Sequence, residues 1–268
     1  MITLVLILAV LLGLMALMPG SPFEVSEFGV TSGADVRGMG WWLLHGQYFY
    51  SFQLHAPLNE ILLDAFVVSF FLGFTTLISA AFLAIPCGCL LALSQNIFFD
   101  IILSCGLALP SYLIGSFLLL AAPWMHLPSA LWESPASMIL PAVTLGMRPF
   151  FVLTSITRTS MRQVLSEPYI TYASAQGVPW LRVLFRHALP NAALPIVGIT
   201  GSLTSHLVTG SFVVESMYQI PGLGKYLIIG VMNRDYPLAL GCVFLCACVL
   251  ILVGVCTDLV LAYLDPRL

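Results

Sequence analysis

The strongest constraint on this chain is a succession of long segments that contain almost no charged residue. Only 8% of the residues are charged and 60% are hydrophobic, whereas a soluble domain carries about 25% charged residues to cover its surface. About 20 apolar residues in a helix cross the hydrocarbon core of a bilayer. The apolar segments are 1–18, 65–93, 97–122, 136–157, 191–216 and 237–264. The sequence therefore predicts an all-α, polytopic membrane protein with about six transmembrane helices.

Three parts are expected along the chain. Residues 1–22 form a first transmembrane helix and a Pro-Gly-Ser-Pro turn, and we expect this helix to be retained because no basic segment precedes it as in a signal peptide. Residues 23–64 contain five acids, one arginine and many aromatic residues, a composition typical of the external interface. Residues 65–268 form a five-helix core that includes a cytoplasmic loop at 158–190.

The basic residues predict the orientation. Arg158, Arg162, Arg182 and Arg186 lie in the longest polar stretch between the later spans, and Arg267 follows the last span. Loops rich in arginine and lysine remain in the cytoplasm. Six crossings then place both termini in the cytoplasm and the segments 23–64, 123–135 and 217–236 outside the cell.

The 158–190 loop is predicted to contain two short helices. Ser166-Glu167-Pro168 is a helix-start signal. Gly177 followed by Val178-Pro179 ends that helix, and a second helix, Trp180 to Leu189, runs up to Pro190. Small residues line the break, which leaves two interpretations open: a docking site for another protein, or an amphipathic connector lying on the inner leaflet.

A resemblance favours docking. The sequence Thr171-Tyr-Ala-Ser-Ala-Gln-Gly177, followed after nine residues by His187-Ala-Leu-Pro190, resembles the "EAA…G…I-x-LP" loop of binding-protein-dependent ABC importer permeases. Thr171 and Tyr172 replace the Glu and Ala of that pattern. The blocks that resemble the oligopeptide, dipeptide and nickel branch are Arg186-His-Ala-Leu-Pro-Asn-Ala192, Val214-Glu215, Pro221-Gly-Leu-Gly224, Asn233-Arg-Asp-Tyr-Pro237 and Asp265-Pro-Arg267. The resemblance covers residues 60–268.

The resemblance implies a type I importer permease in the inner membrane, which forms the pathway for short peptides, or for nickel and related solutes. Its expected partners are a second permease chain, giving a heterodimer, two ATP-binding subunits and an external solute-binding protein. This chain would bind no cofactor, since ATP and Mg would lie on the ATP-binding subunits. The implied coupling residues are Glu167, Thr171, Tyr172, Ala173, Ser174, Ala175, Gln176, Gly177, Leu189 and Pro190.

Several polar residues lie inside the predicted spans. Ser202, Ser205, His206 and Thr209 are spaced to share one helical face. That face either lines a hydrated pathway or packs against another helix. A stripe formed by Ser69, Gly73, Thr76 and Ala80 is predicted to be a packing seam. Arg148 and Glu215 are expected near span ends, in contact with headgroups or water.

The sequence gives little support to a metal-binding protein, a membrane enzyme or a secondary transporter. The five histidines have no partner at helical metal-ligand spacing, so no metal site is predicted. No hydrolase motif is present, which argues against a membrane enzyme. The remaining alternative is a stand-alone secondary transporter or channel, which would be expected to carry internal repeats and a charge relay within the membrane.

Overall fold

The computed structural model describes residues 9–10, 51, 54–94, 96–128, 132, 134–209, 212–233 and 235–264. The predicted first helix at 1–18, except residues 9–10, and most of the predicted external segment 23–64 lie outside the described residues; the last part of that segment, from Leu58 on, belongs to a helix. The helices are α3 (Leu58–Ala92), α4 (Ile97–Ala108), α5 (Ser111–Ala121), η2 (Pro135–Met138), α6 (Ile139–Leu165), α7 (Pro168–Ala175), α8 (Trp180–Arg182), η3 (Val183–Ala188), α9 (Leu189–Val208), α10 (Phe212–Met217), α11 (Leu223–Met232) and α12 (Tyr236–Leu264). The all-α prediction is confirmed.

Four helical stretches of the described chain are long and apolar enough to cross a bilayer. They are Leu58–Ala92, Ala136–Leu165, Trp180–Met217 and Pro237–Leu264. These stretches correspond to four of the five later apolar segments. The predicted count of six therefore remains approximate, with the first predicted helix outside the described residues.

The fifth segment, 97–122, does not form the continuous helix that its hydropathy predicts. Helices α4 and α5 meet at an angle of 86°. Leu109 leaves the helical conformation with a ψ of 121°, and Pro110 precedes the first residue of α5. Proline has no N–H to continue the helix and pushes the preceding residue toward extended backbone, so the chain turns sharply at this point.

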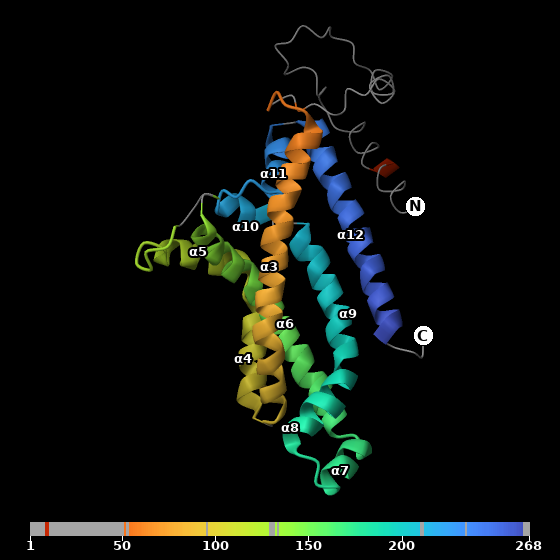
Figure 1. Cartoon of the computed structure of the whole chain (residues 1–268). Helices are drawn as coiled ribbons and strands as arrows, with labels where there is room; N and C mark the ends of the chain where they lie inside the picture. The colour runs from red at the N-terminus through yellow and green to blue at the C-terminus, as the bar shows by residue number, and fades with distance from the viewer. Residues whose placement is uncertain are drawn as a thin grey trace.

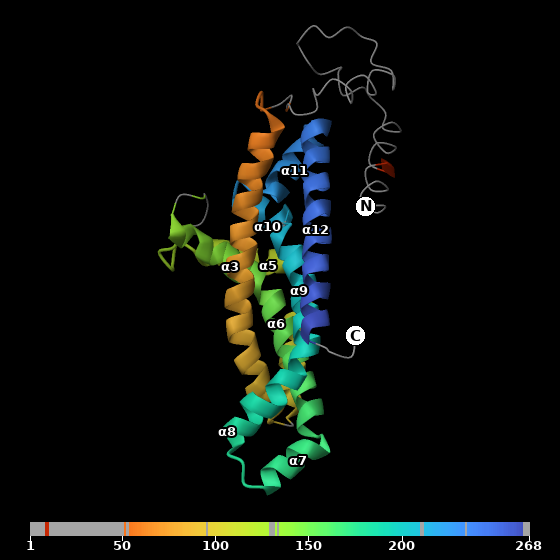
Figure 2. The same ribbon diagram turned by 45° about the vertical axis from the view of Figure 1, so that its right-hand side comes forward.

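The long helices α3, α6, α9 and α12 run side by side as an elongated bundle (Figures 1 and 2). Helices α7 and α8 occupy one end of the bundle, at the bottom of both views. Helix α11 lies at the opposite end, beside the first turns of α3 and α12. Helix α5 extends sideways from the bundle. Helix α11, in the predicted external segment 217–236, therefore lies at the opposite end of the bundle from the predicted coupling segment, whereas α5, which the predicted external segment 123–135 follows, leaves the bundle between its two ends (Figure 1).

Close packing against α3 sets the register of its neighbours. A Cβ placed on Gly88 would lie 2.6 Å from the Thr157 Cβ of α6, and one on Gly73 would overlap the Leu207 carbonyl of α9. Ser69, Gly73, Thr76 and Ala80 are all buried. The predicted packing seam is therefore confirmed, because the small side chains allow α3 to approach the other helices.

Candidate coupling surface and candidate pathway face

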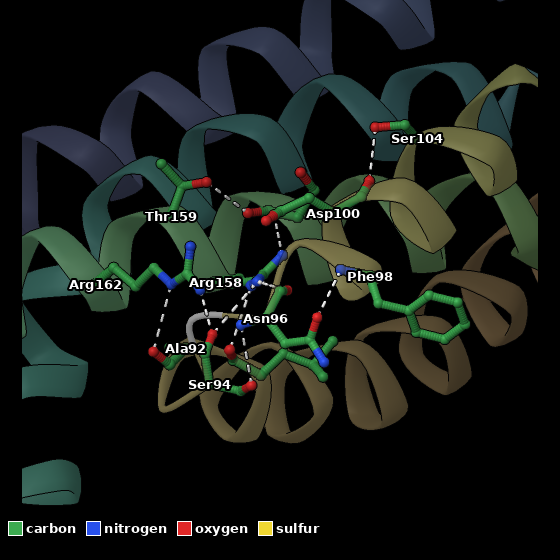
Figure 3. A network of polar contacts seen from close by, with 11 residues as sticks. Ala92, Ser94, Asn96, Phe98, Asp100, Ser104, Arg158, Thr159 and Arg162 are labelled. Carbon is green, nitrogen blue, oxygen red and sulfur yellow. Dashed lines mark hydrogen bonds and ion pairs between the residues drawn. The ribbon is translucent and has the colours of Figure 1, made fainter.

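Helix α6 continues to Leu165, so Arg158 and Arg162 belong to a helix and not to the loop predicted from 158 onward. Figure 3 shows both side chains reaching the end of α3 and the turn after it. Arg158 is only 2% exposed and donates from Nε to the Leu91 carbonyl at 3.2 Å. It also forms an ion pair with Asp100. Arg162 donates to the carbonyls of Ala92 and Ser94.

These contacts give the two positively charged side chains of α6 a structural role at the end of α3. The last carbonyls of α3 have no partner within their own helix. The guanidinium groups donate to the Leu91 and Ala92 carbonyls, in addition to the Ser94 N–H that donates to Leu91. A basic group near a helix C-terminus is also favoured by the helix dipole. The two arginines therefore join the end of α6 to the α3–α4 turn, directly before the predicted coupling segment.

Helix α7 forms where the helix-start and helix-stop signals predict it. It begins at Pro168, after Glu167, and ends at Ala175. Gly177 has a φ of +78°, the left-handed conformation that glycine adopts readily. Backbone N–H groups of Gly177 and Val178 bond back to the carbonyls of Ser174 and Ala173 at 3.0 and 3.3 Å. The predicted helix stop is confirmed, although the Ser166 hydroxyl bonds to the Gln163 carbonyl of α6 and does not cap α7.

The predicted coupling residues lie mostly on the surface of this end of the bundle. Ala173 and Leu189 are half-buried. The exposed members are Glu167, Thr171, Tyr172, Ser174, Ala175, Gln176, Gly177 and Pro190. Ile170 anchors α7 from its other side, buried in one cluster with Val183 and Leu184. The small residues at the break are thus available to another protein.

The structure adds apolar side chains that the motif does not contain. Trp180, Leu181 and Phe185 follow the break and are 45%, 67% and 60% exposed. Large apolar groups exposed next to a docking segment are typical of an interaction surface. Their signal in the sequence was weak, because the same residues also fit an amphipathic helix that lies on lipid.

The second predicted helix does not end at Pro190. Helix α8, the π-helix η3 and α9 follow one another without a break, and Pro190 lies in the first turn of α9. Pro190 thus lies at the junction where the π-helix passes into the α-helix, and it contributes no N–H there. The predicted coupling segment therefore leads directly into a long apolar helix.

The four polar residues predicted on one face of α9 divide into two groups. Ser205 and Thr209 are buried, and the Thr209 carbonyl accepts a 3.5 Å bond from Cys246 Sγ of α12. Ser202 and His206 are exposed. The structure therefore does not bring all four residues to one open surface.

Two charged residues lie deeper in the bundle than expected. Arg148 stands nine residues into α6, and its neighbour Gly146 faces Thr76 near the middle of α3. Glu215 is fully buried. The sequence alone could not reveal either position, because each depends on where a distant helix packs.

Glu215 holds together α3 and α11, on the side of the bundle away from α7 (Figure 1). Its Oε1 accepts a bond from Ser69 Oγ at 2.8 Å, and its Oε2 accepts one from the Gly224 N–H at 2.8 Å. Ser69 Oγ in turn accepts from the Leu223 N–H at 2.9 Å. The carboxylate thus lies at the N-terminus of α11, where the helix dipole favours negative charge. The hydrogen bonds compensate for its burial.

Comparison with known proteins identifies the class to which this architecture belongs. Residues 84–268 match the family model described as the inner membrane component of binding-protein-dependent transport systems. The chain belongs to this family, and it is a multi-pass inner-membrane permease of the ABC importer type, in the dipeptide and oligopeptide branch.

Three relatives illustrate the similarity. The dipeptide transport system permease protein DppB of Bacillus subtilis (strain 168) is 30% identical over 278 residues, which cover 95% of this chain and 90% of the relative. DppB of Escherichia coli (strain K12) is 32% identical over 266 residues, with 85% and 78% covered. The oligopeptide permease protein OppB of Salmonella typhimurium (strain LT2) is 32% identical over 235 residues, with 84% and 77% covered.

Proposed function

We propose that this chain forms one half of a translocation pathway for short peptides and receives motion from separate ATP-binding subunits. The observation that carries the proposal is the exposed break at Gly177, presented on a short helix at one end of the bundle and continuous with α9. The names of the relatives support peptides as the substrate class over nickel. A second permease chain and an external solute-binding protein complete the proposed assembly.

The coupling step follows from the connections of α7. This helix is joined through two residues to α6 and through the break to α8 and α9. A subunit that grips α7 and moves would therefore displace two long helices together as rigid bodies. The exposed Trp180, Leu181 and Phe185 would enlarge the surface that the ATP-binding subunit contacts.

The proposed orientation places the α7–α8 end in the cytoplasm, as the arginine distribution predicts, with both termini on that side. Helix α11 and the first turn of α3 then face the outside, where a solute-binding protein delivers its ligand. Of the predicted pathway residues, we assign Ser202 and His206 to the pathway wall. Ser205 and Thr209 are assigned to packing, because they are buried.

Co-purification tests this proposal. The tagged chain, expressed with its neighbouring transport genes and extracted in mild detergent, should bring an ATP-binding subunit and a second permease chain with it. Proteoliposomes of this assembly should take up a labelled dipeptide only with ATP and the solute-binding protein. Full transport by the chain alone would instead favour a secondary transporter or channel.

A further inference from the structure

Arg148 carries a positive charge at the middle depth of the bundle. Its neighbour Gly146 lies against Thr76, with 3.3 Å between a Cβ built on the glycine and the Thr76 Cγ2. Thr76 is close to the centre of the 35-residue helix α3. Helix α6 runs in the same direction as α3, since Thr157 lies beside Gly88 further along both helices. Arg148 therefore lies about level with residue 78 of α3.

Two exposed polar residues of α9 lie at a similar depth. Helix α9 runs opposite to α3: its Leu207 meets Gly73, and its Ile196 shares a buried cluster with Ala84. Interpolation between these contacts puts Ser202 about level with residue 78 of α3. His206 lies one turn further toward the outer end. The depth of Arg148 therefore matches that of Ser202.

The three side chains also share one side of the α6–α9 pair. At about 100° per residue, Arg148 lies about 200° around α6 from Gly146, which faces α3. Ser202 lies about 140° around α9 from Leu207, which also faces α3. Arg148, Ser202 and His206 are all exposed. The side of the pair that faces away from α3 thus presents Arg148 and Ser202 at membrane depth, and His206 lies about 40° from Ser202 around α9.

The charge of Arg148 requires a polar environment. The only salt bridge among the described residues joins Arg158 to Asp100. No described residue forms a hydrogen bond with the Arg148 side chain. An arginine within a transmembrane helix is costly against lipid and is usually found facing a water-filled route or an anion. A snorkelling position at the end of the span, as expected from the sequence, is not available nine residues into α6.

We infer that Arg148, Ser202 and His206 form a carboxylate-binding subsite on the pathway, which receives the free carboxylate of a short peptide during its passage. A guanidinium group matches a carboxylate with two parallel hydrogen bonds. The serine hydroxyl and an imidazole N–H add further donors. This inference rests on the proposed function and specifies the chemical group of the substrate that the pathway recognises.

Uptake by the complete transporter in proteoliposomes tests the ligand. A labelled dipeptide with a free carboxylate is compared with the same dipeptide as its C-terminal amide, each relative to wild-type uptake. Arg148→Gln should lower uptake of the free dipeptide about tenfold, the equivalent of one charge-assisted pair, and uptake of the amide less than about twofold. Arg148→Lys should retain more uptake than Arg148→Gln, since it keeps the charge.

A matched pair of serines provides the control. Ser202→Ala should lower uptake of the free dipeptide about threefold, by loss of one neutral donor. Ser79→Ala removes the same hydroxyl at nearly the same depth, but from an exposed position on α3 whose hydroxyl bonds to the Thr76 carbonyl. The Ser79→Ala transporter should take up the free dipeptide as fast as the wild type does.

Thiol labelling gives a readout that does not depend on the solute-binding protein. An Arg148→Cys variant should react with a water-soluble thiol reagent beyond the wild-type background, and the free dipeptide should slow this reaction more than the amide does. If the Arg148→Cys variant reacts no faster than the wild type, the position lies against lipid or a partner chain and the inference is overturned.

The remaining outcomes also decide the matter. The arginine does not bind the substrate carboxylate if Arg148→Gln lowers uptake of the free dipeptide and of its amide equally. The same conclusion follows if this variant no longer co-purifies with the second permease chain. The latter result would indicate an ion pair with the partner chain. If the intact wild-type assembly transports no peptide, the proposed function fails before this inference is reached.

Discussion

The carboxylate of Glu215 in α10 accepts a 2.8 Å hydrogen bond from the hydroxyl of Ser69 in α3, 146 positions earlier in the chain. The same two side chains bind the first N–H groups of α11. The long helix α3 and the start of the short helix α11 are therefore joined through one buried carboxylate.

Removing this carboxylate should destabilise the protein. Glu215→Ala leaves the Ser69 hydroxyl and the Gly224 N–H without their acceptor, which we expect to lower the free energy of unfolding by about 3 kcal/mol. Ser69→Ala should cost about 1 to 2 kcal/mol. The measurement is the thermal unfolding midpoint in detergent. Ser104→Ala, at an exposed hydroxyl that bonds within α4, should leave the midpoint unchanged.

The ion pair between Arg158 and Asp100 should respond unequally to loss of either partner. Arg158 is 2% exposed and Asp100 is 51% exposed. Arg158→Met also removes one donor each from the carbonyls of Leu91 and Asn96 and leaves the Asp100 carboxylate without its partner, and we expect a loss of about 3 kcal/mol. Asp100→Asn should cost less than about 1 kcal/mol, because water screens and solvates its side. If denaturation shows that both variants lose the same free energy of unfolding, the buried arginine is not the more important partner of this ion pair.

Gly73 should not tolerate a methyl group. Its Cβ would overlap the Leu207 backbone carbonyl, so Gly73→Ala must push α3 and α9 apart, at a cost of about 1 to 3 kcal/mol. Gly254→Ala is the matched control, since nothing lies within 4 Å of a Cβ there. Alanine favours a helix by up to about 1 kcal/mol over glycine, so this control should be neutral or stabilising in the same melting assay.

Gly177→Arg should abolish uptake without preventing assembly of the bundle. The position has open space around it, but its φ of +78° disfavours most side chains. Gly177→Asn is the control, because asparagine tolerates this conformation and is small. Uptake and ATPase activity of purified assemblies separate the effects: we expect Gly177→Asn to retain transport, whereas normal transport by Gly177→Arg would exclude docking at the break.

Accessibility from the two sides of the membrane tests the orientation. Ser174→Cys on α7 should react with an impermeant maleimide only in inside-out vesicles. Ser134→Cys, in the predicted external segment 123–135, should react in intact cells. Each variant is compared with the wild-type background from its seven cysteines. Labelling of the Ser174→Cys variant from outside intact cells would reverse the proposed topology.

Local signals in the sequence predicted most of the helices. The apolar segments at 65–93, 136–157 and 237–264 were recovered as α3, α6 and α12, because hydrocarbon length and hydrophobicity act on each segment separately. The break at Gly177 was also predicted, since a glycine that can adopt the left-handed conformation, with a proline two residues later, is a local stop signal for a helix. The bend at Pro110 was underestimated, because proline in a membrane helix permits both a kink and a full turn.

The residues alone thus determined that this chain inserts into a membrane, which segments form its long helices, and that the helix before Gly177 stops there. Only the tertiary structure decided that Arg158 closes the end of α3, that Glu215 is buried against Ser69, and that Arg148 shares its depth with Ser202. Hydropathy and helix signals act over a few turns of one segment. The environment of a charged side chain depends instead on which distant helix packs beside it and at what height.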